Sequence, residues 1–241
     1  MADIEAVLFD FGGTLDHDGV DWFSRFYGHI QDCGGGVERE VFQACADRAA
    51  ASLCDDADVM ELLMEGIVGR LCERAHQNVE KQLEQTLPWS GSQIAERFLA
   101  DARQHLAKNK PIVEEVAQRF RVGCISNNWG NTAGWCEQFE LARTFEVMID
   151  SERVGAAKPD ERIFLAALEQ LNLRAEVCVY VGDRFDCDVL GSRGVGMTPV
   201  WITQGAYYGQ YDPADPVVRI SQLEELPEAL DRLCEDVSVQ R

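Results

Sequence analysis

Four short polar motifs carry the residues that are able to do chemistry, and each stands behind an apolar run or at the start of a helical pattern. They are Asp10-Phe11-Gly12-Gly13-Thr14-Leu15, Ser126-Asn127, Lys158-Pro159 and Gly182-Asp183, with Asp188 five residues further on. Together they supply carboxylates, a hydroxyl, an amide and an ammonium group from distant parts of the chain.

This set of groups suits phosphoryl transfer. A carboxylate such as Asp10 can attack phosphorus and form an aspartyl-phosphate, which divides one difficult displacement into two easier ones. The attack brings two negative partners together, so it needs a hard cation such as Mg²⁺, which prefers carboxylate and phosphate oxygens. Ser126 and Lys158 offer donors for the phosphoryl oxygens. We therefore expect these residues and Asp183 to form one site.

Each motif also has a purely structural interpretation. Asp10 before two glycines is typical of a turn, and Ser126 with Asn127 suits the cap of a helix. Lys158 fits a solvated loop, and acidic residues such as Asp183 are favoured at helix N-termini. A shared site is the better explanation, because it accounts for the position of all four motifs in the same half of the fold.

The elements that position these motifs follow from the apolar pattern. Short apolar runs predict strands at 4–9, 122–125, 145–149, 177–181 and 199–202. Helical patterns separate these runs after Pro111, including one that ends near Val116. Strands that alternate with helices indicate a parallel sheet covered on both faces, with ligands bound at the ends of its strands. Residues 207–216 are expected to form an exposed loop.

Residues 16–108 follow a helical pattern without a convincing strand, and we expect four or five amphipathic helices there. The segment Cys33-Gly34-Gly35-Gly36 separates the first from the second. We therefore predict a doubly wound, mainly parallel, Rossmann-like α/β core in residues 1–15 and 108–241. A helical cap in residues 16–107 is inserted into it. The aromatic cluster from Trp22 to Tyr27 is expected to pack inside this cap. Trp129 follows Ser126 closely enough to reach the mouth of the site, but its position fits packing elsewhere equally well.

The four motifs, in this order, resemble those of the haloacid dehalogenase-like hydrolases with a helical cap after the first motif. The sequence from Ser151 to Asp160 and the sequence around Gly191 also resemble this family. The resemblance implies that Asp10 is the nucleophile and a Mg²⁺ ligand, and that residue 12 offers its backbone carbonyl to the metal. The other roles that it implies are phosphoryl and substrate binding by Ser126, Asn127 and Lys158, and metal binding by Asp183. Asp188 is expected to orient the metal site from behind the ligands or through water.

One residue departs from the family pattern. Phosphatases of this family usually carry a second aspartate two residues after the nucleophile, where this chain has Gly12. That aspartate protonates the leaving oxygen and then activates water, and a general acid of this kind contributes about 10² to 10⁴ in rate. Three explanations are open: a substrate with a good leaving group, such as a sugar-1-phosphate or an acyl phosphate, a substitute among Asp16, His17 and Asp18, or vestigial catalysis.

The preferred interpretation is a Mg²⁺-dependent phosphatase of a small phosphorylated metabolite. The alternative is a regulatory protein that binds phosphate or metal on the same scaffold and has lost turnover. A 2-haloacid dehalogenase is less favoured, because those enzymes need no metal and resemble one another in a Ser-Ser or Ser-Asn pair where this chain has Gly182-Asp183.

The composition indicates which partners the protein can bind and in which cellular compartment it is expected. The chain of 241 residues has 42 acidic and 22 basic residues and a formal charge of −20, so it repels nucleic acid and anionic lipid. The nine cysteines form no CxxC pair and no zinc-like cluster. An export leader and a membrane-spanning apolar run are not evident. We therefore expect a cytoplasmic protein without nucleic-acid or membrane partners.

Overall fold

A computed structural model describes residues 3–204, 211–212 and 214–239 of the chain. Its centre is a parallel sheet in the order β3-β2-β1-β4-β5-β6. The strands are β1 (Ala6–Phe9), β2 (Arg121–Ser126), β3 (Val147–Asp150), β4 (Cys178–Gly182), β5 (Thr198–Ile202) and β6 (Val218–Ile220). The order confirms the predicted doubly wound core, because the chain moves outward from β1 in both directions.

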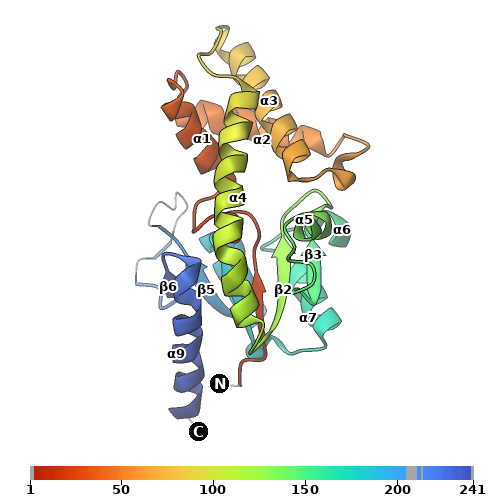
Figure 1. Cartoon of the computed structure of the whole chain (residues 1–241), viewed down its shortest axis with the longest axis vertical. Helices are drawn as coiled ribbons and strands as arrows, with labels where there is room; N and C mark the ends of the chain where they lie inside the picture. Colours follow the sequence, from red (N-terminus) through yellow and green to blue (C-terminus); the bar gives the residue numbers. More distant parts are fainter. Residues whose placement is uncertain (1–2, 205–210, 213, 240–241) are drawn as a thin grey trace.

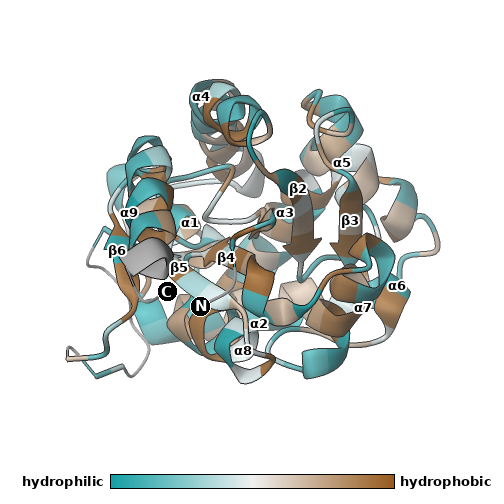
Figure 2. Cartoon of the chain, turned by 90° about the horizontal axis from the view of Figure 1, so that it is seen from below, coloured by the Kyte–Doolittle hydropathy of each residue, from teal (hydrophilic) through white to brown (hydrophobic). Residues whose placement is uncertain are grey.

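Strand β1 lies in the middle of the sheet, and all four of its residues are buried. Val7 and Phe9 pack against α4 (Gly91–Val116), α5 (Thr132–Gln138) and α9 (Leu226–Val239) on one face. Ala6 and Leu8 face α7 (Glu161–Leu171) on the other, where α8 (Leu190–Gly194) also lies (Figure 2). A strand covered on both faces must be apolar at every position, which explains the continuous run in the sequence.

The helical cap contains α1 (Trp22–Asp32), α2 (Arg39–Leu53) and α3 (Met64–Leu83), and it stands above the strand ends in Figure 1. Asp21 caps α1 by accepting from the backbone N–H of Ser24 at 3.1 Å. Glycines 34, 35 and 36 all have positive φ and separate α1 from α2, as predicted. The cap is therefore built from the amphipathic helices that the periodicity indicates.

Helix α4 differs from the prediction, because it continues through Pro111 as one helix of 26 residues. A proline inside a helix removes one hydrogen bond and costs about 3 kcal/mol. Burial of Leu106, Val113 and Val116 on both sides of the proline opposes that cost. The predicted boundary at residues 107 and 108 therefore falls inside α4, which runs from the cap along the core (Figure 1).

Five short helical segments lie between the main helices and strands in the described part of the chain. These are a 3₁₀ turn η1 (Val59–Glu61), helix α6 (Ser151–Val154), a 3₁₀ turn η2 (Ala175–Val177), a π-helical turn η3 (Phe185–Val189) and a 3₁₀ turn η4 (Leu223–Glu225). The helical turn η3 continues directly into α8, and the apolar pattern of the sequence predicted neither β6 nor α9. Residues 207–210 and 213, half of the loop expected at 207–216, lie outside the described residues. Within the described part of the chain, every helix is too short or too polar to cross a bilayer.

Candidate active site

The centre of the site is the buried ammonium group of Lys158, which lies just before α7. Its Nζ is 2.7 Å from Oδ1 of Asp10 and 2.8 Å from Oδ1 of Asp188. It also donates to the hydroxyl of Tyr180 at 2.9 Å, and this hydroxyl donates to the backbone carbonyl of Ile125 at 3.0 Å. Residues predicted from three separate motifs therefore meet at one point.

Asp183 completes a group of three buried carboxylates with Asp10 and Asp188. One oxygen from each lies within 4.8 Å of the others. Among the described residues, Oδ1 of Asp183 is buried and has no hydrogen-bond partner. Three converging carboxylates, one of them with an unpaired buried oxygen, suit a hard divalent cation that takes oxygen ligands.

The protonation behaviour of these groups points to the same need for a cation. Burial raises the pKa of Asp10 to about 6, although Lys158 acts in the opposite direction. Burial also raises the pKa of Asp183 well above its usual range, and the nearby charges of Asp188 and Asp10 add to this effect. Burial alone lowers the pKa of Lys158, but Asp10 and Asp188 more than reverse this. With all three carboxyl groups ionised, the cluster would carry more negative charge than one lysine balances, and a bound cation would favour that ionised form.

Two glycines make the close approach of these groups possible. A Cβ on Gly13 would lie 2.5 Å from Oδ2 of Asp183, and Gly13 has a φ of +85°. A Cβ on Gly182 would lie 2.4 Å from Cγ of Asp188. Both positions lack the space for a side chain, so glycine is required where the loops after β1 and β4 meet.

Asp188 holds the site together from the side of η3. Its Oδ1 accepts from Lys158, and its Oδ2 accepts from the backbone N–H of Arg184 at 2.9 Å. These bonds orient both Lys158 and the loop after Asp183.

Ser126 and Asn127 stand at the end of β2 and line the same cavity as Asp10 and Lys158. The side-chain amide of Asn127 forms two bonds to the backbone of Lys158. Its Oδ1 accepts from the N–H at 2.7 Å, and its Nδ2 donates to the carbonyl at 3.0 Å. Asn127 therefore positions the lysine, a contact that sequence spacing did not indicate.

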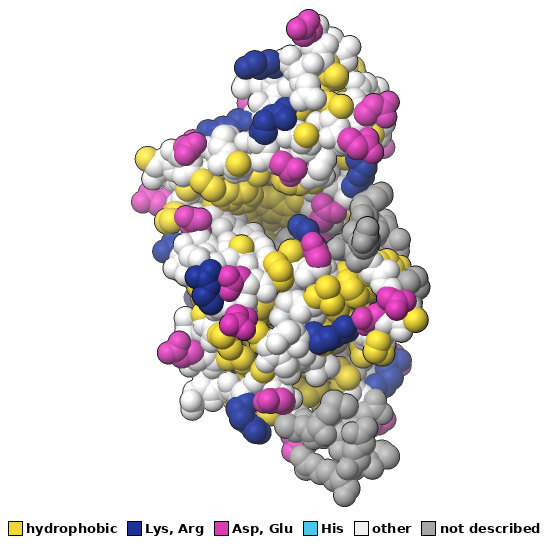
Figure 3. Space-filling model, turned by 180° about the vertical axis from the view of Figure 1, so that it is seen from behind, with side chains coloured by type: hydrophobic (Ala, Val, Ile, Leu, Met, Phe, Trp, Pro, Cys, Tyr) yellow, Lys and Arg dark blue, Asp and Glu magenta, His cyan; other side chains and the backbone are white. Residues whose placement is uncertain are grey.

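The cavity above these groups has a volume of about 190 Å³. One wall is aromatic and consists of Trp22 and Phe23 from the cap with Trp129 and Trp135 from the core. The rings of Trp22 and Trp135 are stacked, with centroids 5.5 Å apart and planes 10° from parallel. On the face of the molecule seen in Figure 3, hydrophobic side chains line a hollow between the cap and the core.

This wall corrects one expectation and agrees with another. Trp22 and Phe23 line the cavity, whereas Phe26 is buried inside the cap as predicted. Trp129 lines the cavity, which was one of two placements that its position behind Ser126 left open. Asp21 also lines the cavity and was not singled out from the sequence. Its only signal was its place at the start of a helical pattern, which indicates a cap and not a site.

Gly12 lies against the indole of Trp22. A Cβ at position 12 would be 3.1 Å from Nε1 of Trp22, which is closer than ordinary contact. The indole N–H donates to Oδ2 of Asp16 at 2.7 Å. The space that a side chain at position 12 would enter is therefore occupied by an aromatic ring whose polar edge is already bonded.

The three residues considered as substitutes for the missing acid are engaged elsewhere, and none lines the cavity among the described residues. Asp16 accepts from the backbone N–H of Gly13 at 2.6 Å and from Arg25 at 3.0 Å. Asp18 accepts from Lys108 at 3.0 Å. The ring of His17 stacks on that of His105, with centroids 4.2 Å apart. Their closeness to Leu15 in sequence did not bring them to the reacting groups.

Known proteins resemble this chain in sequence and in fold. A family model described as haloacid dehalogenase-like hydrolase matches residues 4–196. The chain is 38% identical over 101 residues to the glyceraldehyde 3-phosphate phosphatase of Pyrococcus furiosus, covering 39% of this chain and 40% of that one. It is 36% identical over 129 residues to the enzyme of the same name from Methanocaldococcus jannaschii, covering 53% and 56%. The matched region thus spans about half the length of these relatives.

A solved structure shows the same fold over nearly the whole chain. The HAD-hydrolase YfnB from Bacillus subtilis, bound to magnesium, aligns with a TM-score of 0.57 and 17% identity, covering 95% of this chain and 100% of that one. Because the family model covers well over half of the sequence, and the six-stranded sheet and helical cap agree with it, the chain belongs to the haloacid dehalogenase-like hydrolases.

Proposed function

We propose that this protein is a Mg²⁺-dependent phosphatase of a small phosphorylated metabolite that acts through an aspartyl-phosphate on Asp10. The observation that carries the proposal is the convergence of Asp10, Asp183 and Lys158 in one buried cluster under a cavity. A nucleophilic carboxylate, a cation site and a fixed ammonium group are the parts that phosphoryl transfer needs.

In the first step, a carboxylate oxygen of Asp10 attacks phosphorus, and the bond from phosphorus to the ester oxygen breaks. The leaving group departs with the electron pair of that bond. Lys158 holds Oδ1 of Asp10 at 2.7 Å and keeps the carboxylate oriented. Ser126, at the end of β2, lines the cavity where it can donate to a phosphoryl oxygen.

In the second step, water attacks phosphorus and the bond to Asp10 breaks, which regenerates the carboxylate and releases phosphate. The attacking water loses a proton to the medium, which balances the atoms and charges of this step. Asp188 and Asn127 act on Lys158 in both steps, because they bond its ammonium group and its backbone. They are positioning residues.

The groups that would hold the cation are the carboxylates of Asp10 and Asp183 and the backbone carbonyl of residue 12. Asp188 would orient these groups or act on the cation through water. The unpaired oxygen of Asp183 supports this assignment. When bound, Mg²⁺ reduces the repulsion between the carboxylates and the phosphoryl oxygens.

The missing acid at position 12 restricts the substrate. Without a proton donor, the leaving group departs as an anion, so esters whose alcohol or acid is itself acidic react best. The indole of Trp22 beside Gly12 supports this restriction, because its N–H is bonded to Asp16. The small cavity and its aromatic wall favour a compact substrate. Archaeal relatives named glyceraldehyde 3-phosphate phosphatases support a small phosphorylated metabolite.

The direct test is hydrolysis of p-nitrophenyl phosphate with and without Mg²⁺, using Asp10→Asn as the control. We expect slow turnover that requires both the cation and Asp10. Turnover that persists in the folded Asp10→Asn protein would refute the assignment of the nucleophile. A panel of phosphorylated metabolites scored for phosphate release then identifies the substrate.

A regulatory protein without turnover is the second candidate, and Gly12 is the residue that favours it. Its signature is Mg²⁺ binding by calorimetry with no phosphate release from any ester in the panel. A 2-haloacid dehalogenase is disfavoured by Asp183, since halide displacement needs no metal-binding carboxylate. Halide release from a 2-haloacid without added metal would favour the dehalogenase over the phosphatase.

A cytoplasmic location of the protein remains a prediction. All nine cysteines are free, and none pairs with another in a disulfide. Free thiols are typical of a reducing cytoplasm.

A further inference from the structure

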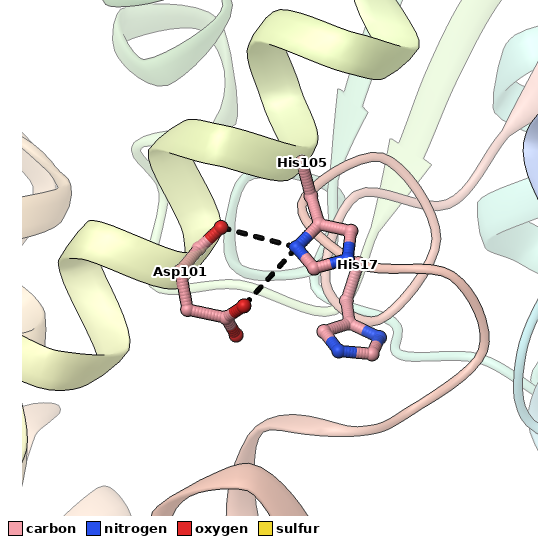
Figure 4. Close-up of side chains that lie close together, drawn as sticks. All are labelled: His17, Asp101 and His105. Atoms are coloured by element: carbon pink, nitrogen blue, oxygen red, sulfur yellow. Dashed lines mark hydrogen bonds and ion pairs between the residues drawn. The ribbon is translucent and has the colours of Figure 1, made fainter.

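A second group of potential metal ligands lies away from the active site, where the linker between β1 and α1 meets helix α4. Figure 4 shows its three members, His17 from the linker with Asp101 and His105 from successive turns of α4. One ligand atom from each lies within 4.8 Å of the others. Among the described residues, none of the three lines the active-site cavity.

Two of the ligands already have the spacing of a metal site. Nδ1 of His105 is 3.2 Å from Oδ1 of Asp101 and 3.1 Å from the backbone carbonyl of the same residue (Figure 4). An ion bound by Nδ1 therefore takes the place of a hydrogen-bonding proton. Two ligands on one tetrahedral Zn²⁺, each about 2.0–2.1 Å from the metal, lie about 3.3 Å apart. A helix holds residues i and i+4 on one face, so α4 fixes this pair without further help.

His17 supplies the third ligand from outside the helix. Its Nδ1 is buried and has no hydrogen-bond partner among the described residues. Its ring is stacked on that of His105 with planes 29° from parallel, so a rotation of the side chain is needed to direct a nitrogen at the ion. An unpaired buried nitrogen gains a partner by that rotation.

The other oxygen of Asp101 is held by Arg25. The guanidinium group of Arg25 lies 2.9 Å from Oδ2 through NH2 and 3.0 Å through Nε. This contact leaves Oδ1 directed at His105 and fixes the carboxylate, as partners of metal-binding carboxylates do. The positive charge also weakens cation binding, so the affinity is lower than that of a site without an arginine.

We propose that His17, Asp101 and His105 bind a transition-metal cation of the Zn²⁺ class at a site separate from the cation site of Asp10 and Asp183. Two imidazole nitrogens and one carboxylate select such ions over Mg²⁺, which prefers oxygen ligands. The bound ion joins the linker to α4. It therefore stiffens the segment whose neighbouring residue, Asp16, bonds both Gly13 of the nucleophile loop and Trp22 of the cap.

The test uses Co²⁺ as a spectroscopic substitute for Zn²⁺, titrated into the full chain with Mg²⁺ in excess at the carboxylate site. We expect visible absorption from one Co²⁺ per chain with nitrogen and oxygen ligands. His17→Gln and His105→Gln should each weaken binding by at least about tenfold. The melting temperature of the wild type should rise on addition of Zn²⁺, and that of the variants should not.

The matched control is His76→Gln. His76 also has a carboxylate at i+4, Glu80, with Nε2 and Oε1 3.6 Å apart. It has no third ligand among the described residues, so this variant should bind Co²⁺ like the wild type. The melting temperature without metal shows whether each variant folds, and His17→Gln removes no hydrogen bond of Nδ1.

Three results would overturn the proposal. The first is equal Co²⁺ affinity in the wild type, His17→Gln and His105→Gln. The second is a sulfur-to-cobalt charge-transfer band, which would assign the ion to a cysteine. The third is the absence of any Co²⁺ binding beyond the carboxylate site. Loss of binding in His17→Gln and His105→Gln alone, with folding intact, supports it whether or not the phosphatase assignment holds.

Discussion

Gly12→Asp is expected to restore hydrolysis of phosphate esters with poor leaving groups. Position 12 lies two residues after Asp10 in the same loop, and a carboxylic acid there could protonate a departing alkoxide. A general acid contributes about 10² to 10⁴ in rate, which corresponds to about 2.7–5.4 kcal/mol of transition-state stabilisation. An aryl ester such as p-nitrophenyl phosphate needs little protonation, so its turnover should change by less than about tenfold.

The structure limits how much of this gain the single substitution delivers. The new Cβ would lie 3.1 Å from Nε1 of Trp22, whose N–H is held by Asp16 at 2.7 Å. Overpacking of this kind costs about 1–3 kcal/mol, or roughly one to two factors of ten. Set against a contribution of about 10² to 10⁴, this cost leaves a gain of up to about 10³ for an alkyl ester in Gly12→Asp. The gain should be larger when Trp22→Leu removes the crowding ring.

The assay compares kcat/KM for glyceraldehyde 3-phosphate and p-nitrophenyl phosphate. Gly12→Asn is the matched control, because it crowds Trp22 equally and carries no acid. A gain in Gly12→Asn equal to that in Gly12→Asp would refute the reasoning. So would a wild-type enzyme that already hydrolyses the alkyl ester as fast as the aryl ester, since the missing acid would then not limit catalysis.

The remaining predictions concern the positioning groups and the intermediate. Gly13→Ala should lower Mg²⁺ affinity by at least about tenfold in calorimetry, because its Cβ would lie 2.5 Å from Asp183. Gly155→Ala, with positive φ but no heavy atom within 4 Å of the new Cβ, should leave that affinity unchanged. Tyr180→Phe leaves the buried carbonyl of Ile125 without its donor and should lower the free energy of unfolding in urea by about 1–3 kcal/mol; an unchanged unfolding midpoint would contradict this role. With p-nitrophenyl phosphate, stopped-flow absorbance should show a burst of about one p-nitrophenolate per site, because no base at position 12 assists the second step. A linear time course from the first turnover would show that the first step limits the rate.

The core could be predicted from the sequence because its strands are continuous apolar runs. Val7 and Phe9 face one layer of helices and Ala6 and Leu8 face the other, so every position of β1 must be apolar. The same reasoning failed at β6, which has only three residues, Val218–Ile220. A run that short carries no period, and its pairing with β5 decides its conformation.

The one helix that the sequence divided wrongly is α4. Proline is a reliable local signal for the end of a helix, but Pro111 lies inside one because buried residues on both sides extend the same packed face. Local propensity predicts the cost of that proline. Only the tertiary contacts of Leu106 and Val113 show that the cost is met.

The sequence by itself determined which groups meet at the candidate site. Asp10, Ser126, Lys158 and Asp183 each follow or face the end of a parallel strand, and parallel strands bring such ends to one edge of the sheet. Only the tertiary structure decided how they are supported, through Tyr180 and Asn127 on Lys158 and Trp22 beside Gly12. The residues in each of these contacts are 10 or more positions apart in the chain. Whether they touch depends on the direction in which packing turns their side chains, and that direction produces no periodic pattern in the sequence.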